Sequence, residues 1–595
     1  MPVFMIPGLP VVRRFALVMG VVLGTVISGP APSLAQSTGL AGPYLAAEHA
    51  ARRGDIQAAA RYFIEALAAD PDNPALVQQA LLHQMAAGKI EGSVALARRL
   101  EELSPGHHLG LLLIAAHDLK SDQYAEVRKL LDSANLDNGP YVGRLMDAWA
   151  AFGDGDVETA RKTLEDLEEA GTGGPAGKMV AAYHLGLLAA ATGDDNAAIE
   201  HFDRSVEVSG GSISNRLSRI KAGSLARTGK VDEAIALIDE RLSRSFGDKR
   251  LEALRVELTE GRLPAPEVTT AAQGAAESLF GVALFLSRGN NRIIGLAYSR
   301  LAVYLDPDLT EAKLAIAELL DNDGQYELAI AAYEAVPRNA PEAFSALIGR
   351  AQALAADDRV EAAIVAMREI VARYPRTIEA HTALGDMLRR EERYADAAEA
   401  YDGAIALIGE PETRHWVLFY QRGITLERSH QWDRAEADFK KALELQPEQP
   451  LVLNYLGYSW IEMGRNFDEA RKMIERAVEQ RPDDGYIVDS LGWVLYRLGK
   501  FEGAVKHLER AVELRPVDAV INDHFGDALW KVGRTIEARF QWKRALSFKP
   551  DENEAERIRK KLEIGLDRVL AEEDAVGAPA LVGGSEAAPV PSDGG

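Results

Sequence analysis

One glycine-rich stretch of the sequence has residues of the types that bind phosphate. Residues 171–178 read GTGGPAGK, and glycines followed by a lysine can cradle an anion. A nucleotide-binding loop also needs a glycine five residues before Gly177 and a hydroxyl side chain directly after the lysine. This sequence has Thr172 and Met179 at those positions, and the stretch joins two predicted helical hairpins with no strand before it. We therefore expect no nucleotide or other cofactor site here.

Histidines supply the other residues that could do chemistry. His107, His108 and His117 lie close together in the chain, but no acidic residues complete a metal-binding pattern around them. We interpret them as solvated loop histidines. His524 shares one predicted helix with Asp523 and Asp527, so its charge should respond to pH. No serine has the setting of a nucleophile, so the sequence predicts a protein that is not an enzyme and holds no metal.

The overall composition excludes several classes of function. The chain has 595 residues, of which 47% are hydrophobic and 26% charged, so it can bury a large core. Its net charge of −23 disfavours binding to nucleic acid and gives no general help in docking on anionic lipid. It has no cysteine, which excludes disulfides and thiolate chemistry.

The first 35 residues have the features of an export signal. Arg13 and Arg14 precede an apolar run over 15–28, and a small-residue cleavage site follows at 33–35. The run is shorter than the roughly 20 residues of a membrane-spanning helix, although retention as an uncleaved anchor stays open. We expect residues 1–35 to be a signal peptide, and the mature chain to begin near Gln36 in the periplasm.

The rest of the chain repeats with a period of about 34 residues. Prolines mark the period. In most copies an alanine stands five residues before the proline, and a large side chain stands eight residues before it. These prolines are Pro71, Pro105, Pro482, Pro516 and Pro550. Chance does not give one residue type such regular spacing, so we expect one structural unit to recur along the chain.

This pattern resembles the tetratricopeptide repeat family. In that family each repeat is a pair of helices, and a small residue in the first helix (here Gly457, Gly492 or Gly526) lets the second approach closely. Proline ends the second helix because it lacks a backbone N–H. The resemblance implies an all-α solenoid of about 14 stacked hairpins. The segment 489–500 also looks like one found in exported repeat proteins of gram-negative bacteria.

The repeats divide the chain into successive segments. We expect a degenerate array over 36–248, an irregular break over 249–275, a second array over 276–552, a capping helix over 553–573 and a disordered tail over 574–595. The break is either a hinge between two arrays or a long loop on one continuous superhelix. The N-terminal units keep the period but several lose the proline.

The resemblance also implies where a partner binds, because the first helices of the repeats line the concave surface. Repeat positions two, five, nine and twelve face that surface. In the last three repeats they place aromatic and acidic side chains together, and an exposed apolar patch often marks a contact. The predicted contact residues are Asn454, Tyr458, Asp489, Trp493, Tyr496, Asp523, Asp527 and Trp530. The alternative is that these rings pack against neighbouring helices.

Together these features predict a non-enzymatic scaffold of the bacterial cell envelope. It would bind a protein or peptide that is apolar and carries some positive charge, during envelope assembly, transport or sorting, in the periplasm or at the inner face of the outer membrane. One alternative is a stoichiometric structural subunit of a secretion or polysaccharide-export machine. Another, an enzyme within the N-terminal repeats, has no acid–base or metal pattern to support it.

Overall fold

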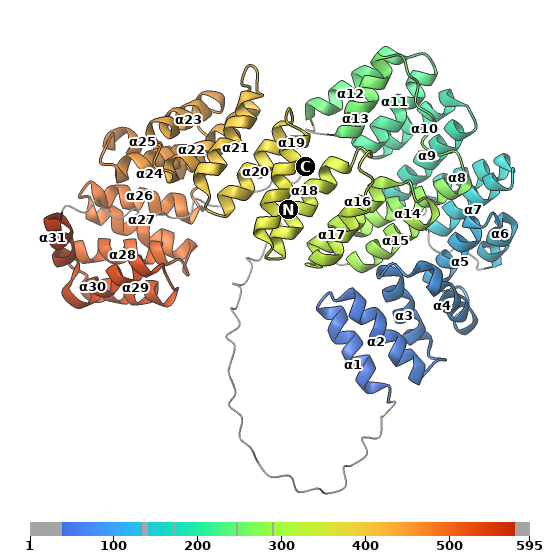
Figure 1. Cartoon of the computed structure of the whole chain (residues 1–595), viewed down its shortest axis with the longest axis horizontal. Helices are drawn as coiled ribbons and strands as arrows, with labels where there is room; N and C mark the ends of the chain where they lie inside the picture. Colours follow the sequence, from blue (N-terminus) through green and yellow to red (C-terminus); the bar gives the residue numbers. More distant parts are fainter. Residues whose placement is uncertain (1–38, 134–140, 172, 245–247, 288–290, 577–595) are drawn as a thin grey trace, which may run out of the picture.

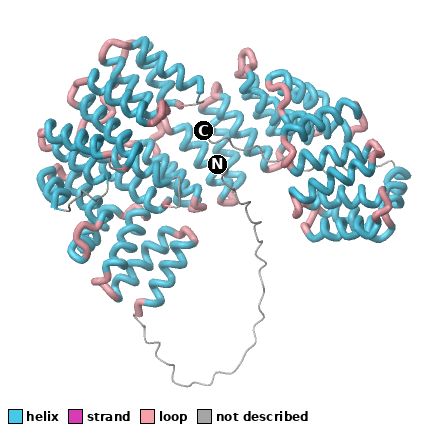
Figure 2. Tube along the Cα trace, turned by 180° about the vertical axis from the view of Figure 1, so that it is seen from behind, coloured by secondary structure: helices cyan, strands magenta, loops and turns pink. Residues whose placement is uncertain are grey.

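The chain folds as a stack of helical hairpins. The computed structural model describes residues 39–133, 141–171, 173–244, 248–287 and 291–576. All regular elements within these ranges are helices joined by short loops (Figure 2). The signal expected at 1–35, and the part of the expected tail beyond residue 576, lie outside the described residues.

The first part of the chain forms six hairpins and a single helix. They are α1 (Ala41–Arg52), α2 (Ile56–Ala69), α3 (Pro74–Ala86), α4 (Ile90–Leu103), α5 (His108–Lys120), α6 (Tyr124–Ser133), α7 (Tyr141–Gly153), α8 (Val157–Ala170), α9 (Gly174–Ala191), α10 (Asp195–Val208), α11 (Asn215–Arg227), α12 (Val231–Arg244) and α13 (Lys249–Thr259).

The second part forms eight hairpins, followed by two short helices. They are α14 (Ala271–Ser287), α15 (Arg292–Leu305), α16 (Thr310–Asn322), α17 (Tyr326–Glu334), α18 (Ala343–Ala356), α19 (Val360–Arg373), α20 (Ile378–Arg390), α21 (Tyr394–Ala406), the 3₁₀ turn η2 (Thr413–His415), α22 (Trp416–Arg428), α23 (Trp432–Leu445), α24 (Pro450–Glu462), α25 (Phe467–Gln480), α26 (Gly485–Arg497), α27 (Phe501–Leu514), α28 (Ala519–Lys531), α29 (Thr535–Ser547), α30 (Glu552–Ile564) and α31 (Leu566–Val576). The fourteen predicted repeats thus each correspond to one hairpin.

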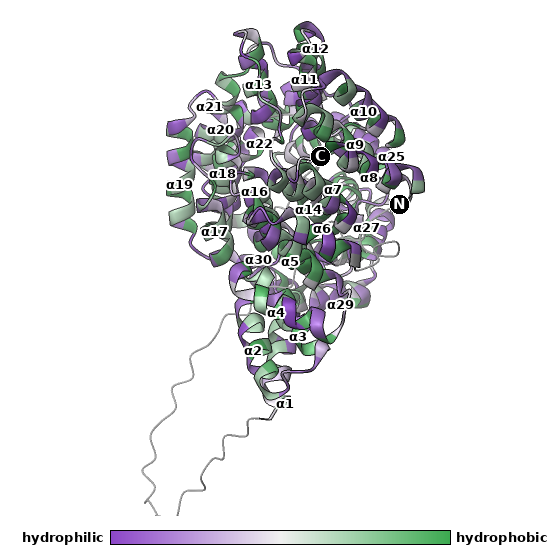
Figure 3. Ribbon diagram, turned by 90° about the vertical axis from the view of Figure 1, so that its right-hand side faces the viewer, coloured by the Kyte–Doolittle hydropathy of each residue, from purple (hydrophilic) through white to green (hydrophobic). Residues whose placement is uncertain are grey.

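Small residues bring the two helices of a hairpin together, as the sequence predicts. A Cβ added to Gly526 in α28 would lie 2.5 Å from the ring of Trp542 in α29. The same atom on Gly492 would lie 2.5 Å from Leu508 in the next helix. Neither helix could bury its apolar face alone, so the stacked neighbours share a continuous core. Figure 3 shows hydrophilic and hydrophobic residues interleaved along most helices, as amphipathic packing requires.

The α14–α15 hairpin occupies a position that its sequence did not indicate. It packs against α3, α5, α7 and α9, which are first helices of the N-terminal hairpins. One hydrophobic core accordingly joins buried residues between Ala47 and Ile220 to residues between Val268 and Ala312. In Figures 1 and 3, α14 lies beside α5 and α7. The N-terminal hairpins therefore curve around α14 and α15.

Two segments differ from the sequence expectations. The break expected over 249–275 contains α13, which begins because the Asp248 side chain accepts hydrogen bonds from the backbone N–H groups of Arg250 and Leu251. The expected single capping helix over 553–573 is two helices, because Gly565 adopts a positive φ of 84° between α30 and α31. Helix α31 continues to Val576, into the first residues of the expected tail.

Candidate functional site

The eight predicted contact residues come together on three parallel first helices. Asn454 and Tyr458 lie on α24, and the others lie on α26 and α28. Asp489, Tyr496 and Asp527 are buried, so they support this surface from below rather than face solvent. The remaining five, including Trp493, are partly exposed. The structure places these residues on neighbouring helices, and their exposure differs from residue to residue. Their contact with a partner stays a prediction.

Trp493 is the centre of an aromatic stack. Its ring is parallel to that of Tyr496 at 4.8 Å between centroids and to that of His524 at 4.0 Å. Its indole N–H donates to Glu462 Oε1 at 2.7 Å, and Arg497 contacts the same carboxylate at 3.1 Å. The ring is therefore stacked against two neighbouring rings and bonded at its polar edge, which favours a packing role for most of its surface.

His524 pairs with a carboxylate of the neighbouring repeat rather than with the acidic residues of its own helix. Its Nδ1 lies 3.0 Å from Asp489 Oδ2, and both side chains are buried. Burial by itself lowers the pKa of His524, but the carboxylate of Asp489 outweighs it, and the net shift is upward. The sequence predicts that the charge of this histidine responds to pH, and the structure identifies Asp489 as the carboxylate paired with it.

The two carboxylates of α28 already have cationic neighbours from the end of the chain. Lys561 of α30 donates to Asp523 at 2.7 Å and to Asp527 at 2.8 Å. Arg557, one turn earlier, lies 3.9 Å from both. Trp542 donates its indole N–H to Asp527 at 2.9 Å. Helix α30 therefore supplies in the same chain the positive charge that the sequence suggested a partner would bring to these residues.

Two oxygen atoms on this surface have no hydrogen-bond partner among the described residues. They are Asn454 Oδ1 and Asp523 Oδ1. A polar atom that is shielded from water and left unpaired costs free energy. Asn454 lies one helical turn before the partly exposed ring of Tyr458 on α24. Both atoms are buried, so a ligand could reach them only if the surrounding side chains moved.

The inner face of the N-terminal hairpins is filled by the α14–α15 hairpin. His117 Nδ1 lies 3.0 Å from the hydroxyl of Tyr304, and His108 Nε2 lies 3.1 Å from that of Tyr298. Lys120 donates to the carbonyl oxygen of Tyr304 at 2.8 Å. The interpretation of these histidines as solvated loop residues was wrong, because both lie on α5 and bond to tyrosines far away in sequence. Sequence spacing gave no signal of this contact.

A buried tryptophan lies at the same contact. Trp149 of α7 donates its indole N–H to Nδ1 of His184 at 3.1 Å, which requires a neutral imidazole. Burial lowers the pKa of His184 to about 3. A Cβ added to Gly274 of α14 would lie 2.0 Å from the ring of Trp149. Only glycine fits at this crossing, so α14 and α7 are closely matched.

A network of charges fastens this arrangement near its end. Arg219 donates to Glu267 at 2.9 Å and to Glu311 at 3.1 Å, and Tyr183 donates to Glu277 at 3.1 Å. The network joins α11, α13, the 260–270 loop, α14, α16 and the start of α18 through the following residues: Arg216, Arg219, Arg250, Glu267, Glu277, Glu311 and Glu342. A charge cluster of this kind cannot be found from local spacing, because its members come from six separate segments.

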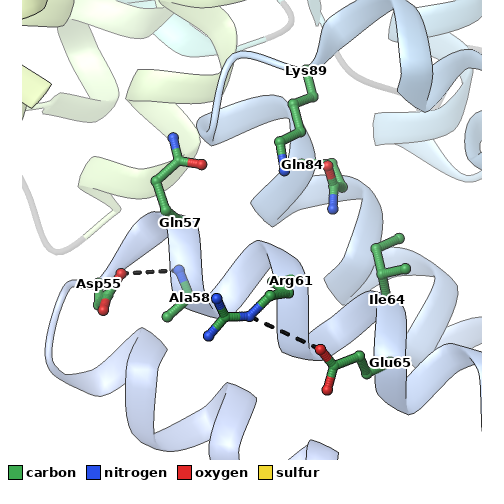
Figure 4. A pocket seen from close by; sticks show the side chains of 8 residues that line it. All are labelled: Asp55, Gln57, Ala58, Arg61, Ile64, Glu65, Gln84 and Lys89. Atoms are coloured by element: carbon green, nitrogen blue, oxygen red, sulfur yellow. Dashed lines mark hydrogen bonds and ion pairs between the residues drawn. The ribbon is translucent and has the colours of Figure 1, made fainter.

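The glycine-rich stretch does not form an anion-binding loop in the described residues. Gly173 precedes the first residue of α9, and Lys178 lies within that helix. A separate hollow beside α2 is lined by exposed polar side chains (Figure 4). There Asp55 caps its own helix by accepting from Ala58 N at 2.9 Å, and Arg61 pairs with Glu65 at 3.9 Å. Neither place holds a cluster of three or more histidine or acidic residues able to bind a metal ion, and the described residues elsewhere hold none.

Comparison with known proteins agrees with the hairpin geometry. The tetratricopeptide repeat family model matches residues 145–213, 314–376, 366–410, 420–484 and 461–519. The chain folds as an all-helical tetratricopeptide repeat (TPR) array. TPR proteins typically act as scaffolds for protein–protein interactions rather than as enzymes, and no catalytic domain is identified in this one.

Individual relatives of this TPR protein are distant. It is 27% identical over 189 residues to human tetratricopeptide repeat protein 13, a match that covers 30% of this chain and 21% of the human protein. Among solved structures, the APC/C hetero-tetramer Cut9–Hcn1 has 14% identity, covers 83% of this chain and 96% of its own, and has a TM-score of 0.36. A TPR protein from Parabacteroides merdae has 17% identity, covers 43% and 98%, and also has a TM-score of 0.36. None of the described helices of the TPR array is long and apolar enough to cross a membrane.

Proposed function

We propose that this TPR protein is a non-enzymatic scaffold that binds a protein or peptide on the inner face of its C-terminal hairpins. One observation carries the choice of surface. The inner face of the N-terminal hairpins is filled by α14 and α15, whereas α24–α28 keep partly exposed aromatic rings on three neighbouring first helices.

The partner should combine apolar side chains with a modest positive charge. Tyr458, Trp493 and Trp530 offer apolar ring surface, and aromatic residues often anchor an interface. Since Lys561 and Arg557 already neutralise part of the acidic charge on α28, a strongly basic partner gains little there. Specificity should therefore depend more on the rings and on Asn454 than on long-range charge.

We propose that the scaffold works in the periplasm of a gram-negative bacterium. The support is the pattern of residues 1–35 and the likeness of the segment 489–500 to exported repeat proteins. Fractionation of cells, followed by N-terminal sequencing of the purified chain, tests this: we expect a periplasmic protein that begins near Gln36. A cytoplasmic protein that begins at Met1 would contradict the proposal.

The binding surface is tested by capture of partners from envelope extracts with the full chain. An Asn454→Ala/Trp493→Ala variant should lose the specific partner, and a Lys506→Ala variant should keep it, because Lys506 is exposed on the second helix α27. Circular dichroism first establishes that each variant folds, and an Asn454→Ala single variant provides a milder change. A partner retained equally by all variants would place the binding site elsewhere.

The same capture separates a transient adaptor from a permanent subunit. A structural subunit of an export or secretion machine should elute with its partners in fixed stoichiometry during gel filtration. An adaptor should dissociate on dilution. The alternating charges along the outer helices α25 and α27 suit a soluble surface in either case.

A further inference from the structure

The outer face of α29 carries two large apolar side chains in solvent. Ile536 is 85% exposed and Phe540 is 64% exposed. They lie one helical turn apart on the side of α29 opposite the buried Trp542 and Ala545. Val517, which precedes α28, is also exposed, and it follows Pro516, whose carbonyl accepts from Arg544 of α29 at 2.9 Å. Ile536 and Phe540 form an apolar stripe on α29 near the end of the array, and Val517 lies in the loop before α28.

The repeat fold does not require apolar residues at these positions. In α27, one period earlier, the residues equivalent to Ile536 and Phe540 are Glu502 and Lys506. The next outer positions of α27 are Glu509 and Arg510, a mixture of charges. Outer helices of a solenoid are normally polar because they face water. The stripe on α29 therefore departs from the pattern of the chain's own repeats.

The charge around the stripe also departs from the rest of the chain. The segment 534–549 has five cations and one carboxylate, although the whole chain has a net charge of −23. That carboxylate, Glu537, already pairs with Arg534. Lys543 and Lys549 are exposed and have no acidic partner among the described residues. Acidic residues of α27 lie nearby, but Glu513 is itself paired with Arg510.

We propose that this face of α29 docks on the surface of a bilayer that contains anionic phospholipid. Ile536 and Phe540 would enter the boundary between headgroups and acyl chains, and Lys543 and Lys549 would contact the phosphates. Lys543 lies on α29 and Lys549 in the loop that follows it. Apolar residues with cations beside them are features of interfacial helices. A stable protein partner needs about 800 Å² of surface on each side, which two apolar side chains on an outer helix do not offer.

This surface is separate from the inner face, so both can be occupied at once. Helix α29 is the second helix of its hairpin, and its buried residues face α28. Bilayer binding would therefore hold the TPR array at a membrane while α24–α28 remain free for a protein. The inference does not depend on the identity of that partner or on the proposed function of the inner face.

The test is cosedimentation of the full chain with lipid vesicles. We expect binding to phosphatidylcholine vesicles that contain about 30 mol% phosphatidylglycerol, and weak binding to phosphatidylcholine alone. An Ile536→Ser/Phe540→Ser variant should bind about tenfold less tightly or worse, since it loses both apolar anchors. A Lys543→Ser/Lys549→Ser variant should bind less tightly to the anionic vesicles only, as should the parent in about 0.5 M salt.

A matched control is available within the chain. Val365 is the sixth residue of α19, as Phe540 is of α29, and it is 54% exposed but has Glu361 in place of Ile536. A Val365→Ser variant should bind vesicles like the parent. The proposal is overturned if the parent does not bind anionic vesicles, or if Ile536→Ser/Phe540→Ser binds as tightly as the parent. It is also overturned if sedimentation shows self-association that this variant abolishes, since the stripe then joins two copies.

Discussion

Lys561 is fully buried, although its ammonium group is charged. Its side chain has no exposed surface, and it lies 2.7 Å from Asp523 and 2.8 Å from Asp527. A Lys561→Met variant would keep the volume of the side chain and leave two carboxylates without their nearest cation. Removing one partner of a buried ion pair typically costs about 3–5 kcal/mol. Arg557, 3.9 Å away from both carboxylates, compensates partly, so we expect a loss near the lower figure, about 3 kcal/mol.

The loss should be local, because each repeat of a solenoid contacts only its neighbours. Hydrogen exchange measured along the chain is therefore the appropriate assay. A loss of about 3 kcal/mol corresponds to exchange about a hundred times faster for amides that open locally. We expect this change in α28, α30 and α31, and no change in α1–α12. Urea unfolding followed by one global signal would average this local loss of stability with the unchanged repeats.

A double variant separates charge from packing. Asp527→Asn combined with Lys561→Met removes one of the two abandoned charges and retains the oxygen that accepts from Trp542. It should recover part of the lost protection. Burial raises the pKa of Asp527, although Lys561 opposes that shift, so without the lysine the carboxyl should hold a proton more readily. Unchanged exchange in Lys561→Met at both pH 7 and pH 5 would refute the argument that the two carboxylates depend on this cation.

Three further changes test the packing and the buried histidines. Gly274→Ala should cost about 1–3 kcal/mol by crowding the tryptophan ring beneath it and make the α14–α15 hairpin sensitive to limited proteolysis, whereas Gly281→Ala on the same helix meets open space and should not. Burial lowers the pKa of His184 to about 3, so the unfolded chain takes up a proton at this histidine before the folded chain does as the pH falls below about 6.5. The stability of the N-terminal hairpins should therefore decrease on acidification. Urea titrations at pH 7 and pH 4.5 should show a smaller decrease for His184→Gln. The pKa of His524 is raised instead, so the stability that this histidine contributes is complete below about pH 6.5 and is lost as the pH rises through its pKa in the folded chain. NMR titration of the imidazole should show that Asp489→Asn lowers this pKa. An unchanged pKa in that variant would contradict the pairing.

The hairpins were predictable because their cause is local and periodic. Prolines such as Pro516 follow the second helix in many of the repeats, and glycines such as Gly526 lie where two helices cross. These features recur about every 34 residues, so the structure of one repeat predicts the stack of hairpins. The extra helix α13 was missed, because it lacks a partner helix to give it a repeat pattern. The split of the capping segment was missed because Gly565 is a single residue in an otherwise helical pattern.

The candidate site was predictable in place but not in detail. Repeat positions bring Asn454, Trp493 and Asp523 to neighbouring first helices, and that follows from the period alone. Their exposure depends on which segments pack over them. One such segment is α30, which follows the last repeat and therefore has no repeat pattern that would predict its position. The bond from Asp489 to His524 spans two repeats and has no signature in either.

Because α14 and α15 cover part of the inner face, the number of repeats overstates the surface that a ligand could reach. In a simple solenoid every hairpin adds a strip of inner face that a ligand could reach. Here four hairpins use their first helices, α3, α5, α7 and α9, to hold a hairpin of the same chain, with Trp149 packed against Gly274. The arginine–glutamate network around Glu267 adds a link from α11. Those hairpins serve as a structural base, and the proposed function leaves ligand binding to α24–α28. Variation among ligands should therefore follow substitutions on α24–α28, whereas substitutions on the inner face of α3–α9 should act through stability.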